Sequence, residues 1–352
     1  MSDKRNAVID IAKGIGIILV ILGHLAIPGD LLCTFIYTFH MPLFFFLSGC
    51  VMSSKYLKGG ISKRIYPMLL VYTEICLIST VICSLIPSIT VTRYMFIYTV
   101  ILMVQPEIIY AGHLWYLIAT AWCFALFFVI NNMFYKRRLY AGFAAFLIYS
   151  ITAAVSTKFI DVIIGDYQVA DIFKIRTSFI GFLFFELGYI IKECDILSKF
   201  QKSSPIPVVL LLLSGICCTE LANLINGKVN IAMPLLKDPV VYLFGSISGI
   251  IMIYAASVLL EKNGIIKKIL TWYGRHTLPI FITHIWFINI IQWVMGKYAI
   301  GLTDTKGHFA VPLAFTFAIM ICIVEIPATK LFDLTLGKLN AYILSPKEIK
   351  EE

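Results

Sequence analysis

Long apolar stretches alternate with short charged or Pro/Gly-containing breaks along the whole chain. A membrane-spanning helix needs about 20 mostly apolar residues, because the hydrocarbon layer is about 30 Å thick. The pattern predicts ten spans, at residues 7–27, 34–54, 65–87, 113–130, 139–155, 177–191, 206–225, 240–260, 277–294 and 309–332. We therefore expect an all-α, polytopic membrane helix bundle in which residues 1–352 form a single domain.

Basic residues indicate how the spans are oriented, since cytoplasmic loops are rich in Lys and Arg. Lys4 and Arg5 precede the first span, and the next basic cluster, at residues 55–64, follows the second span. The basic cluster at residues 136–138 falls on the same side only if the short apolar run 94–104 does not cross the membrane. We therefore expect ten spans, both termini in the cytoplasm, and a re-entrant or interfacial segment at 94–104.

Composition supports lipid as the solvent and excludes several classes of function. The chain has 352 residues, of which 60% are hydrophobic and 14% charged, whereas a soluble domain has about a quarter charged residues. The net charge of +9 reflects the basic cytoplasmic loops and gives no support for nucleic-acid binding. Nine cysteines lack CxxC spacing, so we expect neither a disulfide framework nor a metal site.

Two histidines lie near the same predicted membrane surface. His24 is close to the end of the first span and His40 close to the start of the second, so both lie within roughly 10 Å of the outer interface. Asp10 precedes His24 by fourteen residues, close to four helical turns, and shares its helix face. Lys13 lies one turn along from Asp10. Charged groups within spans normally face a bundle interior, but the alternative is that Asp10, Lys13, Arg64 and His24 only reach the interface.

Further polar residues occur within the apolar runs. They are Glu74, Glu186, His284 and Glu325. His113 opens the fourth span and is followed by Trp115, Tyr116 and Trp122, for which anchoring in an interfacial aromatic belt is the alternative interpretation.

Several motifs resemble those of one known family. The segments "IDIAKGIGIILVILGH", "FHMPLFFFLSG" and "KRIYP", followed later by "GHLWYL" and "TLPIFITHIW", resemble the acyltransferase-3 family of integral membrane proteins. The branch of fucose 4-O-acetylase and related sugar O-acetyltransferases looks closest. The layout of about ten spans covers the whole chain, while the specific motifs lie mainly in its first 70 residues.

The resemblance implies a function and a set of site residues. It implies transfer of an acyl group, acetyl in the usual case, from cytoplasmic acyl-CoA to a hydroxyl of an extracytoplasmic or lipid-linked glycan, with no permanently bound cofactor. It also implies a multi-pass protein of a bacterial cytoplasmic membrane. Its motifs place the catalytic base at His24, served by Asp10 and Lys13, and His40 falls on the second motif as a further catalytic candidate. We expect donor binding at Lys13, Lys63, Arg64 and Ser48, and acceptor binding at His113, Trp115, His284 and Glu186. Some branches of the family carry arginine where this chain has Lys13, and lysine offers only a point charge.

The chemistry of these residues agrees with acyl transfer. An imidazole with an ordinary pKa near 6.5 suits a general base for a hydroxyl, and His40 or His113 are candidate donors to the developing oxyanion. Asp10 and His24 are separated by about 21 Å along a helix, close to the length of the acyl-pantetheine arm. Acyl-CoA could therefore enter from one side and meet the acceptor at the other.

Two rival functions stay open at this stage. A polysaccharide or small-molecule exporter would share the hydropathy and the intramembrane charges, and a polytopic sensor or scaffold would leave His24, His40 and Arg64 unexplained. Ser48 lacks a G-x-S-x-G context and is not favoured as a nucleophile. The sequence leaves open the acceptor, the acyl group, an acyl-histidine intermediate and the oligomeric state.

Overall fold

A computed structural model describes residues 6–53, 62–84, 111–133, 135–159, 162–164, 167–169, 171–231, 237–298 and 308–344. These residues form a helical bundle with one two-stranded antiparallel hairpin. The longer helices are α1 (Ala7–Leu25), α2 (Leu31–Cys50), α4 (Ser62–Ser84), α6 (Trp115–Met133), α7 (Arg138–Phe159), α8 (Ile175–Glu193), α10 (Pro205–Asn226), α11 (Pro239–Leu260), α12 (Gly264–Arg275), α13 (Thr277–Tyr298) and α14 (Val311–Phe332). Shorter elements are η3 (Gly112–Leu114), α9 (Ile196–Gln201), α15 (Lys338–Leu344), β1 (Val162–Ile164) and β2 (Tyr167–Val169).

Eight helical stretches of the described chain are long and apolar enough to cross a membrane. Helices α7 and α8 do not reach that level, since the apolar part of α7 is Arg138–Thr152 and α8 carries four charged residues, two of them in its last turn. The predicted membrane bundle is therefore confirmed in outline. The count of ten spans and the side of each terminus stay predictions, and residues 94–104 lie outside the described residues.

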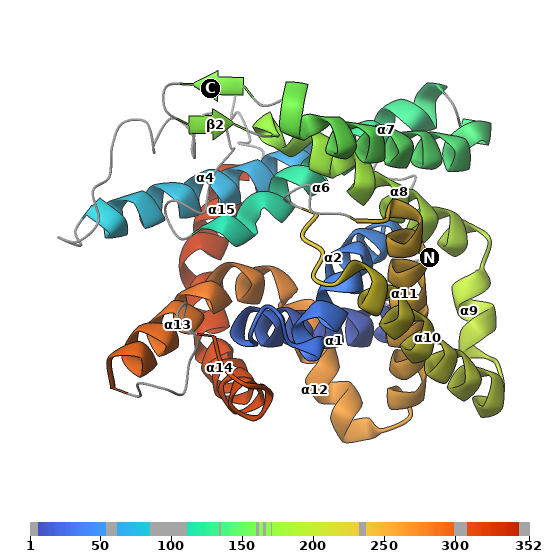
Figure 1. Cartoon of the computed structure of the whole chain (residues 1–352). Coiled ribbons are helices and arrows are strands. Elements are labelled where there is room, and N and C mark those ends of the chain that lie inside the picture. Colours follow the sequence, from blue (N-terminus) through green and yellow to red (C-terminus); the bar gives the residue numbers. More distant parts are fainter. Residues whose placement is uncertain are drawn as a thin grey trace, which may run out of the picture.

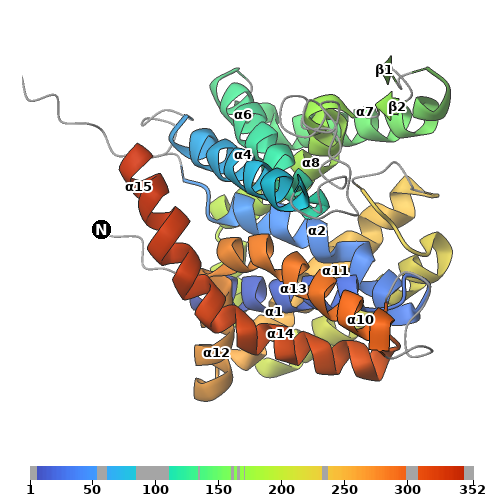
Figure 2. The same cartoon turned by 90° about the vertical axis from the view of Figure 1, so that its left-hand side faces the viewer.

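Helix α1 is the centre of the bundle. It packs against α2, α11, α12, α13 and α14. Figure 1 shows α13 and α14 to its left and α10 and α11 to its right, and Figure 2 shows the same arrangement from the side of α13 and α14. The end of α1 is tied to the start of α14, because the Phe309 amide donates to the Leu25 carbonyl at 2.8 Å. Side chains on α1 can therefore reach cavities on several sides.

Helix α12 was not predicted as a separate element. The Asn263 side chain caps its first turn by accepting hydrogen bonds from the amides of Ile265 and Ile266. Its crossing with α1 depends on two glycines. A Cβ atom at Gly14 would lie 2.1 Å from the Leu270 carbonyl oxygen, and one at Gly274 would lie 1.8 Å from the Asp10 carbonyl oxygen. Only glycine lets the two backbones approach so closely.

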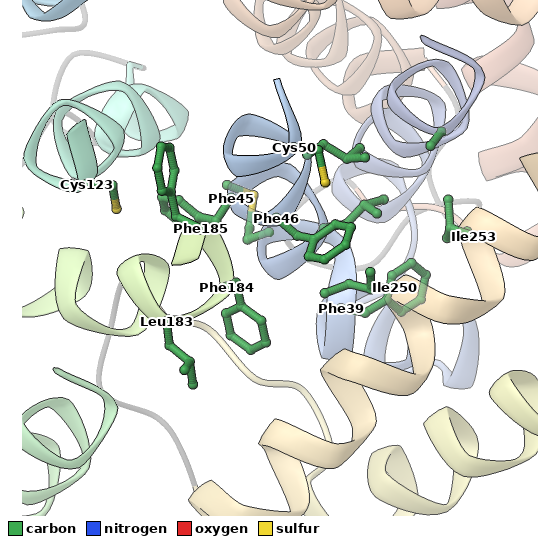
Figure 3. Packing of buried hydrophobic residues seen from close by; sticks show 14 of the residues in the cluster. Phe39, Phe45, Phe46, Cys50, Cys123, Leu183, Phe184, Phe185, Ile250 and Ile253 are labelled. Atoms are coloured by element: carbon green, nitrogen blue, oxygen red, sulfur yellow. The ribbon is translucent and has the colours of Figure 1, made fainter. Parts of the chain in front are cut away.

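Helices α2 and α8 make a similar crossing. A Cβ atom at Gly49 would lie 2.0 Å from the Phe185 carbonyl oxygen, and one at Gly188 would lie 2.0 Å from that of Phe46. Phenylalanines of both helices fill the space around the crossing (Figure 3). On its other side α2 packs against α11, where Phe39 meets Ile250. Gly49, which belongs to the "FHMPLFFFLSG" motif, therefore has a packing role.

Candidate active site

One cavity, here called the histidine cavity, lies at the C-terminal end of α1. Its volume is about 290 Å³. Three histidines line it, together with aromatic and amide side chains: His24, His40, His113, Tyr37, Trp115, Tyr242, Phe281, Asn230 and Asn289, with Val20, Met41, Gly112, Val229, Ile231 and Ile285 completing the wall. The cavity therefore draws on α1, α2, α6, α11, α13 and the segment that follows α10.

His24 is half-buried in the wall of this cavity. Its ring lies 6.4 Å from the Tyr37 ring and 5.5 Å from the His284 ring, measured between centroids. The Tyr37 ring in turn contacts His40 at 4.7 Å. His24 and His40, which were predicted to lie at a similar depth, therefore line the same cavity, with Tyr37 beside both rings.

Hydrogen bonds fix the ring nitrogens of His40 and His113. Nδ1 of His40 lies 2.9 Å from the Ile36 carbonyl oxygen, and Nε2 of His113 lies 3.1 Å from the Ile282 carbonyl oxygen. A carbonyl oxygen only accepts, so each of these nitrogens carries the proton and donates it. A neutral imidazole has one N–H, and the opposite nitrogen of each ring is therefore an acceptor. Either ring would have to be protonated to act as the predicted oxyanion donor.

His284 is fully buried and lies behind the cavity wall. Its ring is 5.5 Å from that of His24 and 5.3 Å from that of His113. Its Nδ1 donates to the Ile280 carbonyl oxygen at 3.0 Å, and its Nε2 has no hydrogen-bond partner among the described residues. His284 lines neither cavity of this site, so the geometry favours packing against His24 over the predicted contact with substrate, which stays a prediction.

A second cavity, here called the basic cavity, lies toward the N-terminal end of α1. Its volume is about 410 Å³. Lys13, Lys63, Arg64 and Arg275 line it, together with Ser48. Lys13 precedes His24 by eleven residues, which is about 16 Å along a helix. All four residues predicted to bind the donor therefore lie in one cavity. The basic residues 55 and 58 of the predicted inner cluster are outside the described residues.

The two cavities meet at an aromatic side chain. Phe281 of α13 lines both. Its ring lies 5.3 Å from His113, on the side of the histidine cavity, and 5.6 Å from Tyr116, which lines the basic cavity. The Tyr116 hydroxyl lies 3.2 Å from the Ser48 hydroxyl. Phe281 thus belongs to both walls, and Tyr116 lies beside it in the wall of the basic cavity.

Asp10 contacts a residue of the basic cavity and not His24. It is buried, and one of its carboxylate oxygens accepts a hydrogen bond from Arg275 Nε at 3.4 Å. The ion pair positions Arg275 at the wall of the basic cavity. Any help that Asp10 gives to His24 must therefore act over the length of α1, and its catalytic assignment stays a prediction.

Glu186 lies away from both cavities, between α8 and α7. Its carboxylate accepts two hydrogen bonds from the Arg138 guanidinium, at 2.8 and 2.9 Å, and both side chains are buried. The guanidinium also lies 4.1 Å from the Phe127 ring and 4.4 Å from that of Tyr189. This geometry favours a structural role for Glu186. Its predicted contact with the acceptor stays a prediction.

Several residues of the two cavities were not predicted from sequence. Tyr37, Asn230, Asn289 and Phe281 carry no signal that distinguishes them from ordinary residues of an apolar span. Arg275 was not among the predicted site residues either. Its position two residues before the "TLPIFITHIW" motif was the available signal, since that motif supplies Phe281 and His284.

Comparison with known proteins agrees with the resemblance of the motifs. The model of an acyltransferase domain, the acyltransferase-3 family, matches residues 6–325. No curated protein and no solved structure gives a significant match. The matched region contains every residue that lines the two cavities. The chain belongs to the acyltransferase-3 family and is a membrane acyltransferase.

Proposed function

We propose that the protein transfers an acetyl or similarly short acyl group from acyl-CoA to a hydroxyl of a glycan, with His24 as the general base. One observation carries this proposal. A cavity with four cationic side chains and a cavity with three histidines lie along the same helix and meet at Phe281. The first suits a polyanionic donor and the second suits proton transfer.

The basic cavity is the proposed site for the phosphates of acyl-CoA. Guanidinium groups bind phosphate oxygens through two parallel hydrogen bonds, while lysines contribute point charges. Arg64 and Arg275 offer the first kind of contact, and Lys13 the second. With the phosphates bound there, the acyl-pantetheine arm would pass Phe281 and Tyr116 to reach His24.

The histidine cavity is the proposed site for the acceptor. Ligand sites are typically lined by apolar and aromatic side chains with a few polar groups that set orientation. Trp115 and Tyr37 offer flat apolar surfaces, and Asn230 and Asn289 offer amide groups for sugar hydroxyls. These features support a sugar acceptor, as in the sugar O-acetyltransferase branch. The placement of that acceptor on the extracytoplasmic face of a bacterial membrane is part of the proposal and rests on the family resemblance.

The proposed reaction is a direct transfer. His24 accepts the proton of the acceptor hydroxyl while the hydroxyl oxygen attacks the carbonyl carbon of the thioester. A new C–O bond forms, the C–S bond breaks, and the proton held by His24 passes to the departing thiolate. The products are the acyl ester and free CoA. Because neutral His40 and His113 use their N–H groups on carbonyls, the amides of Asn230 and Asn289 are better placed to donate to the oxyanion.

Replacement of His24 tests the proposal. Cells that produce the wild type, His24→Ala or the control His308→Gln are compared by mass spectrometry of their surface glycans. His308 lines neither cavity. We expect the wild type and the control to add an acyl mass to a glycan, and His24→Ala to lower that signal by about 100-fold or more, the usual contribution of a general base.

Thermal stability of the purified proteins provides the second measurement. A donor that binds the folded protein stabilises it by an amount that grows with the logarithm of its concentration over Kd, so acetyl-CoA should raise Tm equally for the wild type and His24→Ala. Near-normal glycan acylation by His24→Ala would remove His24 from the base role. If acetyl-CoA neither binds the wild type nor is consumed by it, an exporter function would be favoured instead.

A further inference from the structure

The segment that follows α10 forms part of the histidine cavity. Gly227 ends α10 with φ of +65°, a conformation that side-chain-bearing residues rarely adopt. This turn directs the next residues back over the bundle. Val229, Asn230 and Ile231 then line the cavity. Lys228 comes directly before them in the chain and is half-buried, but it is not itself part of the cavity wall.

Hydrogen bonds hold both ends of this segment in place. The Asn226 side chain donates to the Asp238 carbonyl at 3.2 Å and accepts from the Asp238 amide at 2.8 Å, which joins the end of α10 to the start of α11. The Ile231 carbonyl accepts from the hydroxyls of Thr177 and Tyr149. The backbone around Lys228 is therefore fixed relative to the cavity.

The Lys228 side chain extends toward the catalytic histidines. Its ammonium lies 4.2 Å from the centre of the Tyr37 ring. The same ring lies 4.7 Å from His40 and 6.4 Å from His24. The ammonium, His40 and His24 all lie near the Tyr37 ring. The distance between the ammonium and the His24 ring is therefore no greater than the width of one or two sugar residues.

Within the described part of the chain, no ion pair includes Lys228. The wall of the histidine cavity contains no Asp or Glu. The ammonium also lies within hydrogen-bond reach of the Cys33 thiol. A cation–π contact contributes about 0.5–1 kcal/mol at an exposed site, and a lysine has three N–H donors, so ammonium hydrogens are left to bind an anion.

We infer that Lys228 selects acceptors whose acyl-accepting sugar carries an anionic group. This inference rests on the proposed function, because it assumes that the acceptor hydroxyl lies at His24. A sugar that places one hydroxyl on His24 would reach Lys228 with a substituent on the far side of its ring. A carboxylate of a uronic acid and a phosphate of a lipid-linked or free sugar phosphate share the required chemistry. Lys228 is thus a specificity-determining residue that orients the sugar.

Matched acceptors test the inference on the purified full-length protein in detergent. The panel contains the methyl glycosides of glucose, galactose and mannose, the three corresponding methyl uronides, and the three sugar 1-phosphates. Transfer of labelled acetyl from acetyl-CoA is measured as kcat/KM for each. We expect the wild type to prefer one anionic class over its neutral partners. The uronide and phosphate arms distinguish the two sources of the anion.

Substitution of Lys228 assigns that preference to the ammonium. Lys228→Met should lower kcat/KM for the anionic acceptors by about tenfold or more, as expected for the loss of a charged hydrogen bond, and leave the neutral glycosides unchanged. Lys228→Arg should keep most of the preference. Lys237→Met is the matched control, because Lys237 lies in the same connection between α10 and α11 but is exposed and lines neither cavity.

Each outcome bears on one of the two proposals. Equal use of neutral and anionic acceptors by the wild type, or an unchanged preference in Lys228→Met, overturns the inference and leaves the proposed function standing. An equal loss for both classes in Lys228→Met also overturns it, since Lys228 would then act on the reaction as a whole. Absence of transfer to every member of the panel contradicts the proposed function itself.

Discussion

The histidine cavity and the basic cavity share one helix and one phenylalanine, yet their walls differ in chemistry. The basic cavity has four cationic side chains and no histidine, whereas the wall of the histidine cavity has three histidines and no charged Lys, Arg, Asp or Glu. A base becomes positively charged when it takes a proton, and nearby cations oppose that charge. Separation along α1 keeps the four cations of the basic cavity away from the base, and leaves the Lys228 ammonium beside Tyr37 as a cation close to the histidines.

The largest effect is expected where the two cavities meet. Phe281→Trp enlarges the side chain that lines both of them. If the acyl arm passes this ring, the larger indole will hold the thioester away from His24, and a displacement of about 1 Å can cost 100-fold in rate. We expect kcat/KM for acyl transfer to fall by about that factor. The measurement is transfer of labelled acetyl at fixed acceptor.

The rise in Tm caused by acetyl-CoA shows whether Phe281→Trp blocks the passage of the acyl arm or abolishes donor binding in the basic cavity. It should stay unchanged in Phe281→Trp, since the cations are untouched. Phe287→Trp is the control, because Phe287 lies on the same helix but lines neither cavity. Full transfer by Phe281→Trp would mean that the donor reaches His24 by another route.

A smaller effect is expected within the basic cavity alone. Arg64→Gln removes one guanidinium from the proposed phosphate site. A hydrogen bond to a charged group contributes about 1.5–3 kcal/mol, so KM for acetyl-CoA should rise about tenfold or more while kcat at saturating donor is kept. The control is Lys262→Gln, which removes an exposed charge outside both cavities. A fall in kcat with unchanged KM would place Arg64 in the chemical step instead of donor binding.

The sequence predicted those parts of the site that lie within one or two neighbouring helices. The depth of His24 and His40 followed from helical rise and a short hairpin, and the two rings do line one cavity. The grouping of Lys13 with Lys63, Arg64 and Ser48 followed from the family motifs. Local geometry and a shared membrane depth were enough for the first result, and the second also needed the resemblance to a known family.

Contacts between helices distant in sequence were not predictable in the same way. Glu186 has the sequence signature of a functional carboxylate in an apolar helix, but its partner is Arg138, which the sequence showed only as part of a basic loop. Asp10 was assigned to His24 by the family motif and a shared helix face, whereas the crossing of α12 brings Arg275 to it. A single sequence contains the titratable groups but does not contain the packing that pairs them.

The crossing of α12 with α1 offers the finest test of the two cavities. Gly274→Ala places a Cβ atom 1.8 Å from the Asp10 carbonyl oxygen, so the two helices must move apart. Overpacking of this kind typically costs about 1–3 kcal/mol, which should lower Tm. The movement would also shift Arg275 in the basic cavity. We expect a rise of a few-fold in KM for acetyl-CoA, with KM for the acceptor unchanged. Gly264→Ala is the control on the same helix, since its Cβ would meet nothing within 4 Å. Equal changes in the KM values of both substrates would show that the cavities respond as one site, against the separation argued above.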